Sequence, residues 1–196
     1  MTRYDFLVES YRTERLKTLG VWSQVPLARM DLRVEPRART PREHMVHQCT
    51  SEENWMNGML GIEVSRPPLP AVETRDAFIE HYAAASAERL GQLALAGDAW
   101  FEAETTFFDV QRSRAWVLTR RLTHSAHHRG QLNALLRIWG EPLYSIYGPT
   151  ADTGGLAANG GRVIYRFQSE DDARRGAAAD APALPGPGEK APTERR

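Results

Sequence analysis

Three features are scarce in this sequence, and each scarcity excludes a class of protein. The 196-residue chain has a single cysteine, Cys49, which excludes an internal disulfide and agrees with a reducing compartment. No segment is apolar for long enough to span a membrane, and residues 1–11 lack the apolar run of a signal peptide. Neither charge is in excess, because 25 Lys and Arg residues balance 25 Asp and Glu residues. We therefore expect a cytoplasmic protein with no membrane or nucleic-acid partner.

The chain is long enough for one folded domain with a hydrophobic core. After Ser169 the composition turns to alanine, proline, glycine and charge, which supplies too little apolar surface to offset the entropy cost of ordering. The sequence therefore predicts one domain over residues 1–168 and a disordered tail over residues 169–196.

Four segments carry apolar residues at helical spacing. They cover residues 4–25, 41–60, 74–96 and 113–139. The second begins with Thr40, Pro41 and Glu43, which provide a capping hydroxyl, a proline at the first helical position and a glutamate for a capping box. The last is the longest, with Ser113 as its cap and Gly140 at its end. This pattern predicts an all-α protein, a four-helix bundle.

Two further segments break the helical pattern. Residues 99–111 alternate and are rich in β-branched and aromatic side chains, which predicts a short hairpin or an extended crossover before the last helix. Residues 144–168 are rich in glycine and small polar residues, and we expect them to form an irregular C-terminal arm packed on the bundle.

Histidines are concentrated on two of the predicted helices. Five of the six fall in two short stretches, namely His44, His47, His124, His127 and His128. Positions four apart lie about 40° apart around a helix, so His124 and His128 share one face with Gln131. A third imidazole from a facing helix would complete a three-nitrogen metal site, and His47 is the candidate. Three neutral imidazoles leave a coordination position open, as in catalytic zinc sites.

Spacing alone leaves alternatives open. His127 lies about 60° from His124 on the other side, and three-residue spacing also serves metals. Histidines on helices are more often surface or hydrogen-bonded core residues, which is the plainer interpretation of His44. Glu52 and Glu53 are the first acids that follow His47, but they project roughly 140° and 240° away from it, so neither is a convincing general base.

Three other residues near the histidines have plain structural interpretations. Gln131 either supports a metal ligand or makes a hydrogen bond between helices. Arg129 points away from His124, and we expect it to pair with a carboxylate or to cap the C-terminal arm. Cys49 is more simply a small buried residue than a nucleophile.

The string His124-Ser-Ala-His127-His128-Arg129-Gly130-Gln131-Leu132 resembles the last helix of the DinB-like superfamily. The stretch His47-Gln48-Cys49-Thr50 is similar to the position of that family's first ligand. The resemblance covers about residues 1–140. It implies a four-helix bundle, frequently a homodimer, that holds one zinc, nickel or similar ion with His47, His124 and His128, while His127 lies outside.

The resemblance also reduces the number of candidate functions. Members of the superfamily include transferases and isomerases that use mycothiol, bacillithiol or glutathione, proteins described as metal-dependent hydrolases, and proteins without an assigned activity. A Lewis-acidic ion with an open position lowers the pKa of a bound thiol, so that a nucleophile exists at neutral pH. We therefore expect an enzyme that activates a low-molecular-weight thiol for attack on a small-molecule substrate. The alternatives are a hydrolase that activates water and a non-catalytic metal-binding stress protein.

Overall fold

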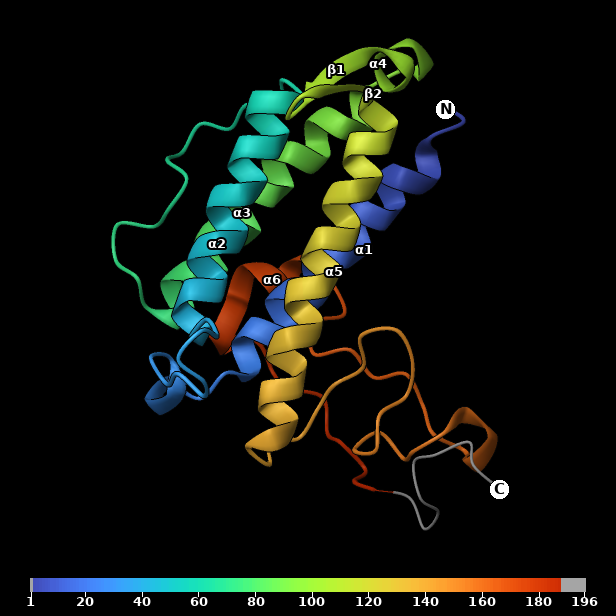
Figure 1. Cartoon of the computed structure of the whole chain (residues 1–196). Coiled ribbons are helices and arrows are strands. Elements are labelled where there is room, and N and C mark those ends of the chain that lie inside the picture. The colour runs from blue at the N-terminus through green and yellow to red at the C-terminus, as the bar shows by residue number, and fades with distance from the viewer. Residues whose placement is uncertain (1, 188–196) are drawn as a thin grey trace.

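The computed structural model describes residues 2–187 and shows an α-helical bundle. Its four long helices are α1 (Asp5–Gln24), α2 (Pro41–Glu53), α3 (Arg75–Leu95) and α5 (Arg114–Ile138). They lie side by side in Figure 1, where α1 packs along α3 and α5, and α2 packs on α5. The prediction of an all-α four-helix bundle is confirmed. None of the described helices is long and apolar enough to cross a membrane.

Polar caps determine where the helices begin. A 3-10 turn, η1 (Leu27–Arg29), starts the loop that leads from α1 to Thr40. The Thr40 hydroxyl accepts from the Glu43 N–H at 3.2 Å, and the Thr40 N–H donates to the Glu43 carboxylate at 2.8 Å, which completes the predicted capping box. The Ser113 hydroxyl caps α5 in the same way, accepting from the Trp116 N–H at 3.2 Å. These bonds satisfy N–H groups that have no partner within the first helical turn.

The second helix ends in a wider turn. Beyond Glu53 the chain continues as a π-helical turn, η2 (Asn54–Met59), in which the Leu60 N–H donates to the Trp55 carbonyl at 3.1 Å. The predicted helix over residues 41–60 therefore has the expected extent, but its last turn is not α-helical. Because a wider turn holds more residues, it redirects the side chains that it carries, and such turns are frequent at functional sites.

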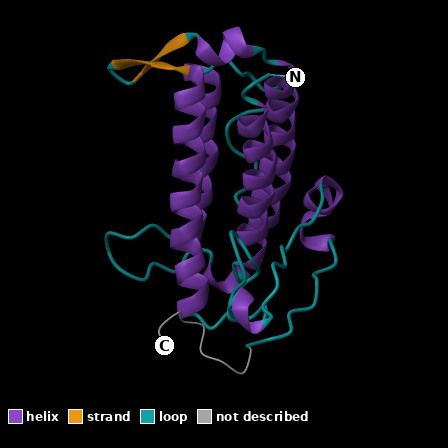
Figure 2. Ribbon diagram, turned by 90° about the vertical axis from the view of Figure 1, so that its right-hand side faces the viewer, coloured by secondary structure: helices purple, strands orange, loops and turns teal. Residues whose placement is uncertain are grey.

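The segment between α3 and α5 contains a short helix, α4 (Asp98–Glu102), and a hairpin of β1 (Glu104–Phe107) and β2 (Val110–Ser113). The strands are antiparallel, with Glu104 opposite Ser113 and Phe107 opposite Val110. Figure 2 shows the hairpin at one end of the bundle. The hairpin expected within residues 99–111 is present, although a turn of helix precedes it.

After α5 the chain forms the irregular arm expected over residues 144–168, with one 3-10 turn, η3 (Ala157–Asn159). Hydrogen bonds within the arm join its two ends, among them those from the Ser145 N–H to the Ile164 carbonyl at 2.8 Å and from the Ile164 N–H to the Ser145 hydroxyl at 3.0 Å. Phe167, at the end of the arm, is buried in the main apolar core. The arm is therefore ordered by contact with the bundle as well as by its own bonds.

Arg129 anchors the same arm from inside the bundle. Its guanidinium is buried, pairs with the Glu14 carboxylate and donates to the Thr18 hydroxyl at 2.9 Å. It also donates to the Tyr147 hydroxyl, which in turn donates to Glu14 at 2.6 Å. Arg129 thus both pairs with a carboxylate and secures the arm, in agreement with its interpretation from the sequence.

The structure departs from the expected tail boundary at residue 169. Residues 169–187 contain α6 (Glu170–Arg175) and a 3-10 turn, η4 (Gly176–Ala178), and bury Ala173 completely against the core. Glu170 pairs with Arg15, a buried residue that also donates to the Ser86 hydroxyl at 2.7 Å. Small side chains suffice here because the bundle already supplies the apolar surface. Residues 188–196, the rest of the predicted tail, lie outside the described residues.

One buried carboxylate joins all four long helices. Glu52, on α2, is 1 % exposed and accepts from the hydroxyls of Tyr11 on α1 and Tyr82 on α3, each at 2.5 Å. It also pairs with Arg121 on α5 at 3.1 Å and with Arg89 on α3 at 3.6 Å. Burial is the largest influence and by itself would raise the pKa of Glu52, but the two arginines and the hydrogen bonds from Tyr11 and Tyr82 together lower this pKa. Glu52 is therefore ionised at neutral pH.

We expect Glu52→Gln to reduce the free energy of unfolding at neutral pH by about 3 kcal/mol, because Arg121 loses a buried counter-charge. The lowered pKa of Glu52 means that its contribution is present above pH 4.5, its ordinary value, and is lost as the pH falls through the folded pKa. Urea unfolding between pH 7 and pH 3 should thus show a shallower acid decline in Glu52→Gln than in wild type. Glu9→Gln, on the exposed surface, is the control, and equal slopes in wild type and Glu52→Gln would contradict the prediction.

A second prediction concerns the packed segment over residues 169–187. A chain ending at Gln168 should unfold at a lower temperature than a chain ending at Pro187, because Arg15 loses Glu170 and Ala173 leaves the core. We expect a difference of about 2 kcal/mol, or roughly 4–8 °C in melting temperature, measured by calorimetry. Equal melting temperatures would show that this segment does not stabilise the bundle.

Candidate metal centre

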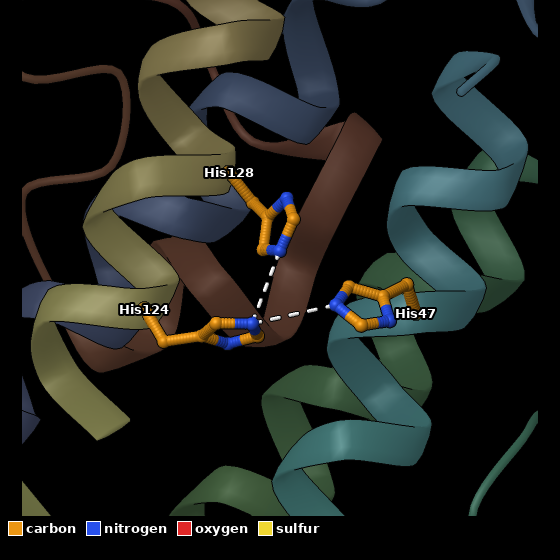
Figure 3. A group of neighbouring side chains, drawn as sticks. All are labelled: His47, His124 and His128. Carbon is orange, nitrogen blue, oxygen red and sulfur yellow. Dashed lines mark hydrogen bonds between the residues drawn. The ribbon is translucent and has the colours of Figure 1, made fainter. Parts of the chain in front are cut away.

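Helices α2 and α5 run antiparallel and bring three imidazoles together between them (Figure 1, Figure 3). His47 projects from the middle of α2, and His124 and His128 project from successive turns of α5. The i, i+4 spacing places the two α5 histidines on one face, as the sequence predicted. The α2–α5 packing decides that this face meets His47.

The three rings converge through their Nε2 atoms. His124 Nε2 lies 3.4 Å from His47 Nε2 and 3.2 Å from His128 Nε2. The rings of His47 and His128 are 4.6 Å apart between centroids, and all three donor atoms lie within 4.8 Å of one another. Nitrogens bound to one tetrahedral zinc at about 2.0–2.1 Å are separated by about 3.4 Å. The three histidines could therefore hold a metal ion.

The rings are uncharged at neutral pH, which metal ligation requires. Burial is the main cause that lowers the pKa of His124 to about 4 and that of His128 to about 3. Burial also lowers the pKa of His47, with further contributions from the positive charges of Arg39 and Arg121. Each ring thus has one nitrogen with a free lone pair.

Gln131 determines which nitrogen of His128 is free. Its side-chain oxygen lies 2.9 Å from His128 Nδ1 and can only accept, so that Nδ1 carries the proton and Nε2 has the lone pair. A hydrogen bond of this kind orients a metal-binding imidazole and fixes its tautomer. Of the two interpretations of Gln131 left open by the sequence, the structure shows support of a histidine of the cluster.

Arg121, which was not among the residues singled out from the sequence, also contacts His124. Its guanidinium Nη1 lies 3.1 Å from His124 Nδ1 and 2.8 Å from the Ser51 hydroxyl. Since Arg can only donate, His124 Nδ1 accepts in this arrangement. A lone pair at His124 Nε2 requires the proton at Nδ1 instead, and Arg121 then has other acceptors in Ser51, the Gln48 carbonyl and Glu52. One turn separates Arg121 from His124, which is the signal that could have identified it.

The remaining histidines lie outside the cluster. His127 is exposed and is not among the three converging rings, although its ring lies 5.0 Å from that of His128. His44 is buried next to His128, with ring centroids 5.4 Å apart, and its Nδ1 has no hydrogen-bond partner. His81 lies near the Pro68 carbonyl, at 3.2 Å. The alternative in which His127 takes the place of His128 is therefore not the arrangement in the structure.

Neither glutamate near His47 in sequence reaches the cluster as a base. Glu52 is held by four partners in the core, and Glu53 pairs with Arg89 at 2.5 Å. The group of converging ligands contains nitrogen donors only. This arrangement agrees with the sequence argument that neither acid is a general base.

Aromatic side chains cover the end of the cluster that faces the hairpin. Trp55, carried by the π-helical turn, stacks on the His124 ring at 5.3 Å with an interplanar angle of 23°. Phe107 from the hairpin packs against Trp55 and Trp116, each at 5.1 Å. Phe108, at the hairpin turn, is 67 % exposed and has a φ of 54°, an uncommon conformation for a bulky residue. The cluster therefore has an apolar wall on the hairpin side.

Known proteins agree with this architecture. A DinB-like protein from Bacillus cereus ATCC 10987 has a TM-score of 0.59 and 18% identity to this chain, with 72% of this chain and 95% of that chain covered. The DinB-like protein YjoA from Bacillus subtilis has a TM-score of 0.57 and 14% identity, covering 72% of this chain and 96% of that one. At these identities the likeness shows the fold alone. No curated protein matches the sequence.

The family model described as the DinB family matches residues 1–155, which include all four long helices and the three converging histidines. The matched range ends before η3, so α6 and η4 lie beyond it. With more than half of the sequence matched, the chain belongs to the DinB family.

Proposed function

We propose that this protein is a metal-dependent enzyme that activates a low-molecular-weight thiol for attack on a small electrophile. His47, His124 and His128 would hold one divalent ion, zinc or nickel. The observation that carries the proposal is the convergence of three uncharged imidazole nitrogens at distances suited to one ion. The homodimer and the cytoplasmic location expected from the sequence stay predictions.

The donor set favours a borderline transition metal. Imidazole suits zinc, nickel, copper and iron, whereas calcium and magnesium prefer oxygen ligands. Three neutral ligands leave the charge of an ion uncompensated and leave room for one more ligand, which favours an anionic fourth partner. A bound ion would supply Lewis acidity, which lowers the pKa of a thiol or of water.

The nucleophile must come from outside the chain. Cys49, the single cysteine, is 3 % exposed, and burial raises the pKa of its thiol to about 12. It is therefore a packed core residue and neither a thiolate nucleophile nor a fourth ligand. A small thiol with access to the cluster would fill the role that Cys49 cannot.

The residues around the cluster would orient the ligands. Gln131 holds His128, Arg121 contacts His124, and the Trp55 ring limits the tilt of His124 by stacking on it. The aromatic wall formed by Trp55 and Phe107 would exclude water from one side of the reacting groups. These side chains would position and shield, but none of them is placed to transfer a proton.

Water activation is the second candidate and has less support. A hydrolase of this design benefits from a general base near the attacking water. The three carboxylates within six residues of His47 are all occupied. Glu43 pairs with Arg33 and accepts from the Thr40 N–H, Glu52 has four partners, and Glu53 pairs with Arg89. A thiol needs no such base once its pKa is lowered, which is why thiol activation is preferred.

The proposed site should hold one metal ion per chain, and replacing any of its three ligands should remove that ion. Purified without an affinity tag, wild type should contain close to one zinc or nickel ion per chain by elemental analysis. His47→Ala, His124→Ala and His128→Ala should each lose most of this metal, because two imidazoles hold such ions weakly. His127→Ala is the matched control and should retain it, since that ring lies outside the cluster. Metal content in His124→Ala equal to that of wild type would refute the site.

Thiol binding can be observed separately from activity. In the cobalt-substituted protein, mercaptoethanol should produce a sulfur-to-metal charge-transfer band, because sulfur is a favourable donor for cobalt as for zinc. The band should be absent in His128→Ala and present in His127→Ala. No spectral change at millimolar mercaptoethanol would favour water activation or a non-catalytic role. Metal-dependent consumption of the thiol with an electrophile is the second observation that transfer requires.

A further inference from the structure

A cleft of about 530 Å³ opens beside the histidine cluster, at the end opposite the hairpin. It lies between the loop that precedes α2, the first turn of α2 and the second half of α5. Its lining consists of Val34, Arg37, Ala38, Arg39, His44, Gln131, Ala134 and Leu135.

This cleft shares part of its wall with the metal centre. Gln131 lines the cleft and its side-chain oxygen accepts from His128 Nδ1 at 2.9 Å. His44 also lines the cleft, and its ring packs edge-on against His128 at 5.4 Å between centroids. A molecule in the cleft would therefore lie against two side chains that contact His128.

The cleft lining carries positive charge and no carboxylate. Three of the four arginines within residues 33–42 have acidic partners, because Arg33 pairs with Glu43, Arg37 with Glu35 and Arg42 with Asp31. Among residues 2–187, Arg39 has no ion pair. The positive charge of Arg39 nevertheless acts on two histidines, because it is one of the causes that lower the pKa of His44 and that of His47.

Two more groups point to a polar ligand in this cleft. The side-chain oxygen of Gln131 is used by His128, which leaves its amide N–H groups as donors on an exposed residue. His44 is 4 % exposed, and its Nδ1 atom has no partner in the described part of the chain. A buried polar atom without a partner is uncommon in native proteins and often marks a position that a ligand or water completes.

We propose that Arg39 and Gln131 form a carboxylate-binding subsite, so that the thiol or electrophile used at the metal centre is a small organic carboxylate. The proposal rests on the proposed function and names its substrate class. One planar guanidinium and one amide offer three or more N–H donors, which matches the two oxygens and single charge of a carboxylate. The carboxylate would sit in the cleft and the reacting end of the molecule would reach the histidines.

Two thiols that differ only at the far end test the subsite. In the cobalt-substituted protein, the charge-transfer band should reach half its full intensity at a lower concentration of mercaptopropionate than of mercaptopropanol. We expect these two concentrations to differ by about fivefold, which is the range of a solvent-exposed ion pair. Arg39→Gln should remove this preference and Arg39→Glu should reverse it, while both retain one cobalt per chain. Arg12→Gln, an equal loss of charge on an exposed part of α1, is the matched control and should keep the preference. A preference that persists in Arg39→Gln would arise from the ion alone and would overturn the proposal.

A second measurement separates this subsite from the proposed function. Propionate, added to the protein with and without metal, should shift the amide resonances of Gln131 and the Nε–H resonance of Arg39 in NMR spectra, and these shifts should be absent in Arg39→Gln. If propionate binds but no thiol gives a band, thiol activation fails and the subsite stands. If thiols give bands but propionate causes no shift, the subsite fails and the proposed function stands. Tighter binding of inorganic phosphate than of propionate would also overturn the assignment to a carboxylate.

Discussion

A single buried carboxylate sets the register of the bundle. Glu52 receives hydroxyls from α1 and α3 and guanidinium groups from α3 and α5, so all four long helices meet at one charge. Burying this charge is costly unless every partner is in place, and a shift of any one helix by one turn would remove at least one of these partners. The apolar clusters on either side tolerate more variation than this network does. The ion pair between Glu52 and Arg121 therefore determines how α2 and α5 are placed along each other's length.

This register is also what assembles the metal centre. Arg121 contacts Glu52 and His124 at once, so the ionic network and the histidine cluster share a residue. With α2 and α5 held at these heights, His47 faces the two histidines on α5, and the π-helical turn carries Trp55 onto the His124 ring. Cys49 is packed into the core on the same helix, so its thiol does not reach the histidine cluster as a nucleophile.

The surroundings of the histidine cluster differ between its two ends. The hairpin end is aromatic, with Trp55, Phe107 and Trp116 in contact. The opposite end is the cleft with Arg39 and Gln131, where a cation and amide donors replace the rings. A substrate with a charged end and an apolar end would be oriented by this difference before it reached the centre, which is how a site with few polar groups can still select its ligand.

The sequence by itself determined the helices and most of the histidine geometry. Thr40 and Ser113 cap where they were expected, and the i, i+4 spacing placed His124 and His128 on one face, because caps and periodicity are local properties of the chain. Spacing left the choice between His127 and His128 open, the resemblance to the DinB-like superfamily implied His128, and His128 is the ring that converges with His124 in the structure. The contact of Arg121 with His124 and the burial of Ala173 were decided only by the tertiary structure. Periodicity gives the angle of a side chain around its own helix, but not which neighbour it faces or at what height. A polar segment such as residues 169–187 becomes ordered when another part of the fold supplies the apolar surface that it lacks.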